Sequence, residues 1–178
     1  MNRSQSIFRL TFCLLLAIGI NLQGCASKGE PEPQKKIGMH IDAVLEFIVE
    51  YPLSWSKDRR LDFGSKHGEV RWTHPGYPQT LLRIKSYIPK QQTLSVDQQI
   101  DHVLHEYSGL EVLTKEVVTL PAGDAWHIMG HTVQAKVEIY LILRTGRSYS
   151  IELTAPRYSI DDDEDVMDRI TQSFQIMP

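Results

Sequence analysis

Cysteine is scarce in this chain, because its 178 residues include only Cys13 and Cys25. Cys13 lies in an N-terminal apolar segment that the sequence predicts to be removed, which leaves Cys25 as the single cysteine of the mature chain. A single cysteine excludes an intramolecular disulfide, so the mature fold cannot rely on one for stability. The lone Cys25 therefore needs another explanation.

An excess of basic residues is also missing. The full chain has 19 Lys and Arg against 22 Asp and Glu, a net charge of −3. Removal of residues 1–24 takes away Arg3 and Arg9 and no acid, which lowers the basic count from 19 to 17 and the net charge to −5. Binding to a phosphate backbone needs a basic face, so the composition argues against nucleic acid as a partner.

The apolar run near the N-terminus is too short to cross a membrane. Leu10 to Ile20 is apolar over eleven residues, whereas a transmembrane helix needs about 20. Two arginines precede this run, and Gly24 follows it just before Cys25. A positive start, a short apolar centre and a small residue at the exit predict a cleaved signal peptide over residues 1–24.

The exit sequence Leu22-Gln23-Gly24-Cys25 resembles the bacterial lipobox. The resemblance implies that the sulfur of Cys25 carries a diacylglycerol with fatty acyl chains such as palmitate. Two or more acyl chains give stable attachment, at about 0.8 kcal/mol per buried CH2. Ala26 stands where inner-membrane lipoproteins of enteric bacteria carry Asp, which implies the outer membrane, facing the periplasm. The lipid anchor thus predicts a membrane partner.

A solvated linker is predicted between the anchor and the folded part. Residues 25–38 consist of the lipidated cysteine and a flexible linker, in which Ala26 to Gly38 are rich in Pro, Lys, Glu and Gly. Fully extended, such a linker spans roughly 40 Å. The remaining residues, 39–178, are predicted to form one domain.

Alternation of apolar and polar residues predicts strands through most of this domain, and a period of 3.6 residues predicts two helices. The order is strands, a helix, a run of strands and a final helix. This order predicts an α+β fold, with a largely antiparallel sheet covered by two main helices. The predicted strands lie near 45–50, 69–73, 81–88, 111–120, 125–133, 136–144 and 148–154, and the predicted helices near 95–107 and 161–174.

Four motifs together resemble the Mog1/PsbP-like α/β superfamily, over about residues 43–176. The resemblance implies an antiparallel sheet with packed helices, and adaptor or assembly roles rather than catalysis. It transfers no functional residue to this chain. The motifs are Tyr51-Pro52-Leu53-Ser54-Trp55, Leu120-Pro121-Ala122-Gly123-Asp124-Ala125-Trp126, the hairpin Gly146 to Ile151 with Ala155-Pro156, and a last helix that runs into Ser173-Phe174.

Histidines and a run of acidic residues are the candidate metal ligands of this sequence. His127 and His131 are four apart in a predicted strand, which separates them by about 13 Å and favours ordinary sheet positions. His102 and His105 are three apart on a predicted helix, but zinc needs further ligands. Residues 161–165 are all acidic, which suits a helix start better than a calcium loop. We therefore assign no metal and no cofactor.

Motifs of known catalytic sites are absent from the sequence: it contains no G-x-S-x-G, H-E-x-x-H, P-loop or G-x-G-x-x-G. Trp55, Trp72 and Trp126 are expected in the core or on a sheet face. The sequence therefore predicts no catalytic residues and a protein that is not an enzyme. The predicted function is a module that binds another envelope protein. A small-ligand or metal carrier and a hydrolase with a dispersed site stay open as alternatives.

Overall fold

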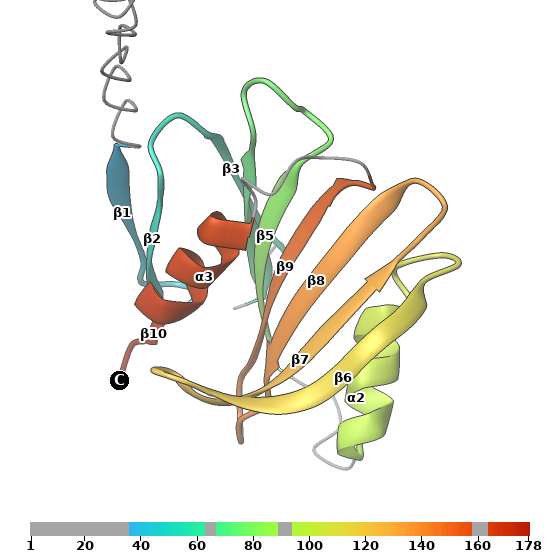
Figure 1. The fold of residues 1–178 in the computed structure, drawn as a ribbon. Coiled ribbons are helices and arrows are strands. Elements are labelled where there is room, and N and C mark those ends of the chain that lie inside the picture. The colour runs from blue at the N-terminus through green and yellow to red at the C-terminus, as the bar shows by residue number, and fades with distance from the viewer. Residues whose placement is uncertain (1–35, 63–66, 89–93, 158–163) are drawn as a thin grey trace, which may run out of the picture. The chain divides into compact units, whose positions relative to one another are not determined.

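A seven-stranded antiparallel sheet in the order β3-β4-β5-β9-β8-β7-β6 forms the frame of the structure (Figure 1). The computed structural model describes residues 36–62, 67–88, 94–157 and 164–178. The strands of this sheet are β3 (Ser56–Leu61), β4 (Gly68–Thr73), β5 (Leu81–Tyr87), β6 (Glu111–Leu120), β7 (Gly123–His131), β8 (Ala135–Ile142) and β9 (Ser148–Pro156).

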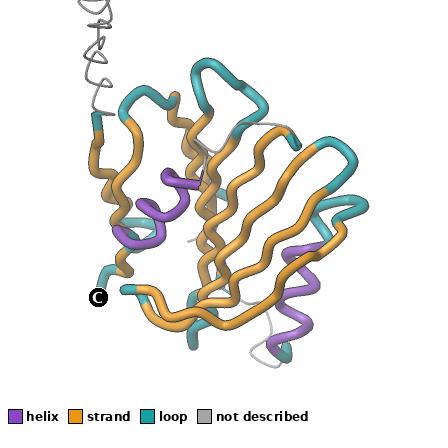
Figure 2. Tube along the Cα trace, viewed as in Figure 1, coloured by secondary structure: helices purple, strands orange, loops and turns teal. Residues whose placement is uncertain are grey.

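A second, three-stranded sheet packs with a short helix on one face of the large sheet (Figures 1 and 2). Its strands are β1 (Ile37–Asp42), β2 (Phe47–Pro52) and β10 (Gln175–Ile176), and the helix is α3 (Glu164–Ser173). Phe47 of β2 and Phe174, which follows α3, are both fully buried, with ring centroids 5.6 Å apart. Together with Trp72 of β4 they form the centre of the larger hydrophobic core.

The opposite face of the large sheet carries a smaller core under helix α2 (Val96–Leu104). Ile100 and Val103 of the helix are buried against β7 and β8. Ser95 caps the helix at the first residue of the predicted range 95–107, because its hydroxyl accepts from the backbone N–H of Gln98, whose side chain accepts from the N–H of Ser95. Gly109 lies beyond the helix with φ of 72°, a conformation that favours glycine.

Strand β9 lies at the centre of the large sheet, between β5 and β8. Every residue from Ser148 to Leu153 is buried. One face meets the larger core, and on the other Glu152 lies against Tyr107, which follows α2. Tyr149 and Ile151 point to the larger core. Glu152 points to the other face and is a charged residue at 1% exposure in the middle of a sheet.

The predicted fold class, an α+β domain with one sheet covered by two main helices, is wrong. The described structure is mostly antiparallel strand, it has two sheets, and its helices are short, with nine residues in α2 and ten in α3. The prediction missed β1, β3 and β10. Strand β3 is exposed at every position, so it has no apolar alternation by which a sequence could reveal it.

Several predictions concern residues outside the described ranges. The signal peptide over residues 1–24, the lipidation of Cys25, most of the linker and Asp161 to Asp163 all lie there. Within the ranges that the structure describes, no helix has both the length and the apolar character needed to span a bilayer.

Candidate interaction surface

The outer face of the three-stranded sheet exposes large apolar side chains. Along β1, His40 and Asp42 point inward and are buried, whereas Met39 and Ile41 are 63% and 59% exposed. Ile41 lies opposite Ile48 of β2, so the two side chains share this outer face. Exposed apolar side chains that lie side by side, unlike scattered ones, are a feature of contact sites when the patch is large.

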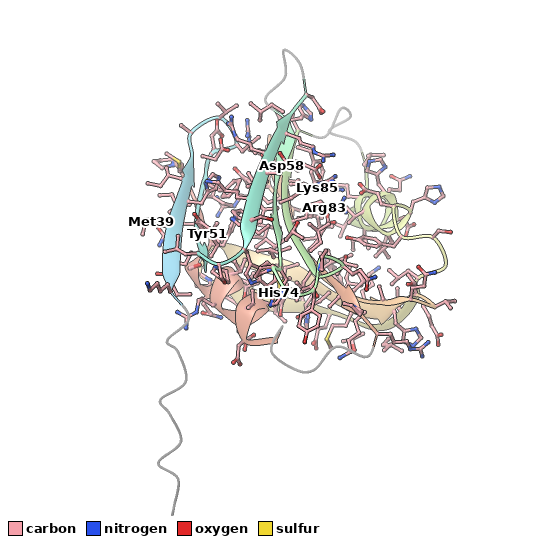
Figure 3. All side chains as sticks on the ribbon, turned by 90° about the horizontal axis from the view of Figure 1, so that it is seen from above. Met39, Tyr51, Asp58, His74, Arg83 and Lys85 are labelled. Carbon is pink, nitrogen blue, oxygen red and sulfur yellow. The ribbon has the colours of Figure 1, made fainter. Side chains whose placement is uncertain are left out.

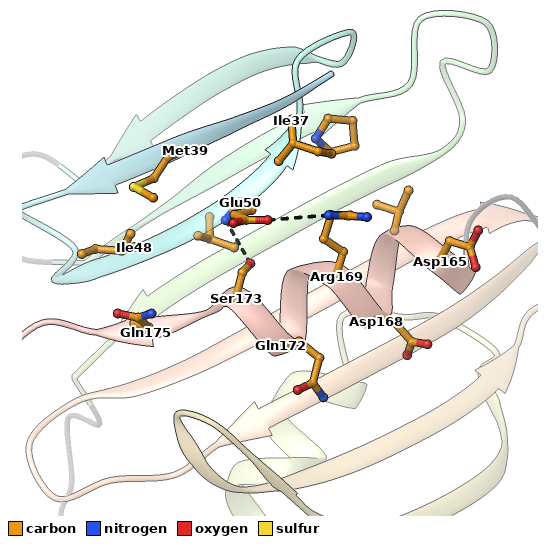
Figure 4. A pocket seen from close by; sticks show the side chains of 13 residues that line it. Ile37, Met39, Ile48, Glu50, Asp165, Asp168, Arg169, Gln172, Ser173 and Gln175 are labelled. Carbon is orange, nitrogen blue, oxygen red and sulfur yellow. Dashed lines mark hydrogen bonds and ion pairs between the residues drawn. The ribbon is translucent and has the colours of Figure 1, made fainter. Parts of the chain in front are cut away.

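A groove of about 750 Å³ runs between this face and α3 (Figure 4). Its apolar side is contributed by Ile37, Met39 and Ile48 of the sheet. Its polar side is contributed by the outward side chains of α3, among them Arg169 and Gln172. We call this combination, the outer face of β1 and β2 together with the groove, the β1–α3 surface.

Two contacts hold α3 against β2 along the groove (Figure 4). The Ser173 hydroxyl accepts from the backbone N–H of Glu50 at 3.0 Å and donates to the carbonyl of Ile170 at 3.2 Å. The carboxylate of Glu50 lies 3.8 Å from the guanidinium of Arg169, and both side chains are about half exposed, at 41% and 53%. These contacts hold α3 in place against β2. The oppositely charged side chains of Glu50 and Arg169 at the rim of the groove remain accessible to water.

A buried polar cluster supports β1 from beneath. Both oxygens of Asp42 accept from Arg59 of β3, at 2.6 and 2.7 Å, and Oδ1 also accepts from the backbone N–H groups of Val44 and Leu45. Burial would raise the pKa of Asp42, but these hydrogen bonds outweigh it and hold the pKa below its usual value. Burial first, and Lys57 second, lower the pKa of His40 below 6.5.

A second polar cluster lies on the opposite face of the large sheet, beside α2. The carboxylate of Glu152 accepts from Arg83, from the hydroxyl of Tyr107 and from the hydroxyl of Ser150. Arg83 and Lys85 of β5, labelled in Figure 3, also pair with Glu106. Burial first, and the neighbouring Glu152 second, raise the pKa of Tyr107, which keeps this hydroxyl protonated.

This cluster opens into a groove of about 580 Å³ between α2 and the strands β4 and β5. The groove combines charged groups, such as Lys85 and Glu106, with the apolar side chains of Ile88 and Leu94. The side-chain oxygen of Gln99 is buried there without a hydrogen-bond partner among the described residues. The structure therefore offers a polar acceptor in a concave site.

The histidines singled out from sequence do not come together. His127 binds Glu138 at 2.9 Å and stacks on Tyr140 with ring centroids 4.3 Å apart, while His131 lies 3.9 Å from Glu111. His102 and His105 are exposed at the end of α2. Among the described residues, no three His, Cys, Asp or Glu side chains are grouped so that they could hold a metal ion.

The aromatic predictions are confirmed. Trp55 and Trp72 are buried in the larger core, and the half-buried Trp126 packs against the smaller core. Sequence reasoning missed Met39 and Ile41, although the alternation of Ile37, Met39 and Ile41 was a signal. It also missed Glu152, because nothing local distinguishes a buried glutamate from an exposed one.

The fold of this domain is similar to that of a solved protein structure. No family model and no curated protein sequence matches the chain. The solution structure of CyanoP, the cyanobacterial PsbP of Synechocystis, is similar at a TM-score of 0.60 and 14% identity, over 87% of this chain and 98% of that one. The domain has a PsbP-like fold. This confirms the fold resemblance that the four sequence motifs predicted.

Two further structures resemble the PsbP-like domain less closely. One is a Bacteroides thetaiotaomicron protein, at a TM-score of 0.43 and 13% identity, over 82% of this chain and 50% of that one. The other is LpqN, described as involved in cell envelope biogenesis of Mycobacterium tuberculosis, at a TM-score of 0.41 and 15% identity, over 85% of this chain and 88% of that one.

Proposed function

We propose that this protein is an envelope lipoprotein, anchored through Cys25 to the outer membrane and facing the periplasm, whose PsbP-like domain is a non-catalytic interaction or assembly module. The β1–α3 surface is the observation that supports the proposal, because it exposes Met39 and Ile41 beside a groove with a polar rim. An apolar centre with a polar rim is the usual anatomy of a protein contact site.

The anchor supports this role by confining the domain. A linker of this length keeps the domain within roughly 40 Å of Cys25. Confinement raises the effective concentration of partners on the same membrane, so even a modest groove is occupied there. The proposed partner is another envelope protein.

The anchor is tested by Cys25→Ser in the full chain, expressed in a bacterial host. The wild type should partition into the detergent phase and incorporate labelled palmitate, and the variant should do neither, because the serine hydroxyl is not a substrate for the sulfur acylation. A wild type without added lipid mass would refute the anchor.

The partner site is tested by photo-crosslinking in cells. A photoreactive residue at Gln172, which lines the groove, should give a discrete crosslinked species, whereas one at Val133, which is 88% exposed and outside the groove, should not. Arg169→Glu should reduce the Gln172 product, because it reverses a charge of the rim. The matched control is Lys115→Glu, which reverses the charge of an ion pair with Asp97 away from the groove. Equal yields from both positions would count against the site.

A second candidate is binding of a small ligand in the groove beside α2. The oxygen of Gln99, which has no partner among the residues that the structure describes, favours it, because a buried acceptor without a donor gains from a ligand that supplies one. Such a ligand would combine a hydrogen-bond donor with an apolar part. A thermal-shift screen of the full chain against Gln99→Leu tests this candidate, and ligands that stabilise both proteins equally would rule out this site.

A further inference from the structure

The two sheets have four edges, and three of them carry features that prevent pairing with another strand. Strand β10 has only two residues. Strand β3 carries charged and exposed side chains from Lys57 to Arg60. Strand β6 has a register shift between Val112 and Thr114. Short edge strands, charged edges and bulges are the means by which natural proteins keep sheet edges from associating.

The fourth edge, β1, has none of these features between Ile37 and Ile41. It pairs with β2 on one side, and no other strand of the described residues pairs with its free edge, which lies at the periphery in Figures 1 and 3. From Ile37 to Ile41 it has no acidic residue, lysine or arginine. Its outward side chains at Met39 and Ile41 are apolar and exposed. An edge of this kind is a template for pairing with a further strand.

The sequence of β1 is complementary to itself in the antiparallel direction. In a register centred on Met39, Met39 faces Met39 of a second copy, Ile37 faces Ile41, and Gly38 faces His40. The outward pairs are then all apolar, and each bulky imidazole lies opposite a glycine. Lys36 faces Asp42 at both ends, and because the Asp42 carboxylate is buried and paired with Arg59, no like charges meet there. We propose that β1 pairs with β1 of a second copy in this register, which joins the two small sheets into one of six strands.

The proposed anchor is compatible with this pairing. Antiparallel strands of six residues place the two N-termini about 20 Å apart. Linkers that each reach roughly 40 Å allow both anchors to sit in one membrane. The pairing goes beyond the proposed function, and it relies on the anchor only for the concentration that confinement provides.

Cysteine crosslinking of the full chain in membranes tests the register. Residues directly opposite in an antiparallel pair have Cα atoms about 4.5 or 5.5 Å apart, which suits a disulfide. Met39→Cys should therefore give a covalent dimer under mild oxidation. Ile37→Cys and Ile41→Cys should each give little dimer alone and much more when the two variants are co-expressed.

Two controls accompany this series. The wild type shows how much covalent dimer forms through Cys25 alone. Val117→Cys places a cysteine at a 55% exposed position of β6, another edge strand. We expect about tenfold more dimer from Met39→Cys than from Val117→Cys, because confinement favours only a specific contact.

Three results would overturn the pairing. The first is an equal yield of dimer from Met39→Cys and Val117→Cys. The second is a dimer yield from Ile41→Cys alone that matches the yield from co-expressed Ile37→Cys and Ile41→Cys, and the third is a Met39→Cys product whose mass shows crosslinking to a different protein. Crosslinking of Met39→Cys in the Cys25→Ser chain at raised concentration separates a failed anchor from failed pairing. Dimer there, with little dimer from a Met39→Cys chain that keeps Cys25 and is nevertheless released from membranes, refutes the anchor alone. No dimer in either chain refutes the pairing.

Discussion

Neutralising Glu152 should destabilise the domain far more than neutralising Glu106, although both carboxylates pair with the same cations. Glu152 is 1% exposed and accepts from Arg83, Tyr107 and Ser150. Glu106 pairs with Arg83 and Lys85 but is 41% exposed. The two substitutions Glu152→Gln and Glu106→Gln keep the size of the side chain and remove one negative charge each, so they isolate the effect of burial.

The expected magnitudes follow from that difference in burial. Removing one member of a buried ion pair leaves its partner uncompensated and costs about 3–5 kcal/mol. Arg83, at 16% exposure, would lose its one fully buried partner and keep only the more exposed Glu106 and, at 3.9 Å, Glu69. An exposed pair contributes about 1 kcal/mol or less, because water screens it. In a domain of this size each kcal/mol lowers Tm by about 3 °C, so Glu152→Gln should lower Tm by about 10 °C or more.

The assay is urea unfolding of the Cys25→Ser chain followed by tryptophan fluorescence, with the free energy of unfolding compared at constant m-value. Trp72 and Trp55 lie in the larger core and report its loss. Equal destabilisation by Glu152→Gln and Glu106→Gln would refute the argument that burial makes this cluster a determinant of stability.

Two further predictions concern other sites. The hydrogen bond to Glu138 raises the pKa of His127 above 6.5, so this pair adds stability that is full below pH 6.5 and is lost as pH rises through the raised pKa. His127→Gln should therefore flatten the fall in Tm above pH 6.5, and an unchanged pH profile would contradict the assignment. Gly130→Ala places a methyl group 2.5 Å from the carbonyl oxygen of Glu111 and should cost about 1–3 kcal/mol. Gly76→Ala, which meets only a side chain at 3.4 Å, should change the unfolding free energy little, and similar costs for both would contradict this packing.

The sequence determined the features that depend on neighbours along the chain. The start of α2 follows from Ser95 and Gln98, whose mutual hydrogen bonds span three residues. The strands of the large sheet between residues 111 and 154 follow from their apolar content, and their order follows from the turns between them. Four short motifs were sufficient to predict the PsbP-like fold. The lipid anchor is also predicted from neighbouring residues, Leu22 to Cys25, and it stays a prediction.

Only the tertiary structure decided the features that depend on residues far apart in sequence. Strand β3 exists because β4 offers it an edge to pair with, and its own residues give no sign of it. Glu152 is buried because β9 lies at the centre of the sheet. Its partner Arg83 is 69 residues away in the sequence. The β1–α3 surface brings the first described strand and the last described helix together. Such placements arise because burial is a property of the packed sheet, whereas alternation records only which side of a strand is apolar.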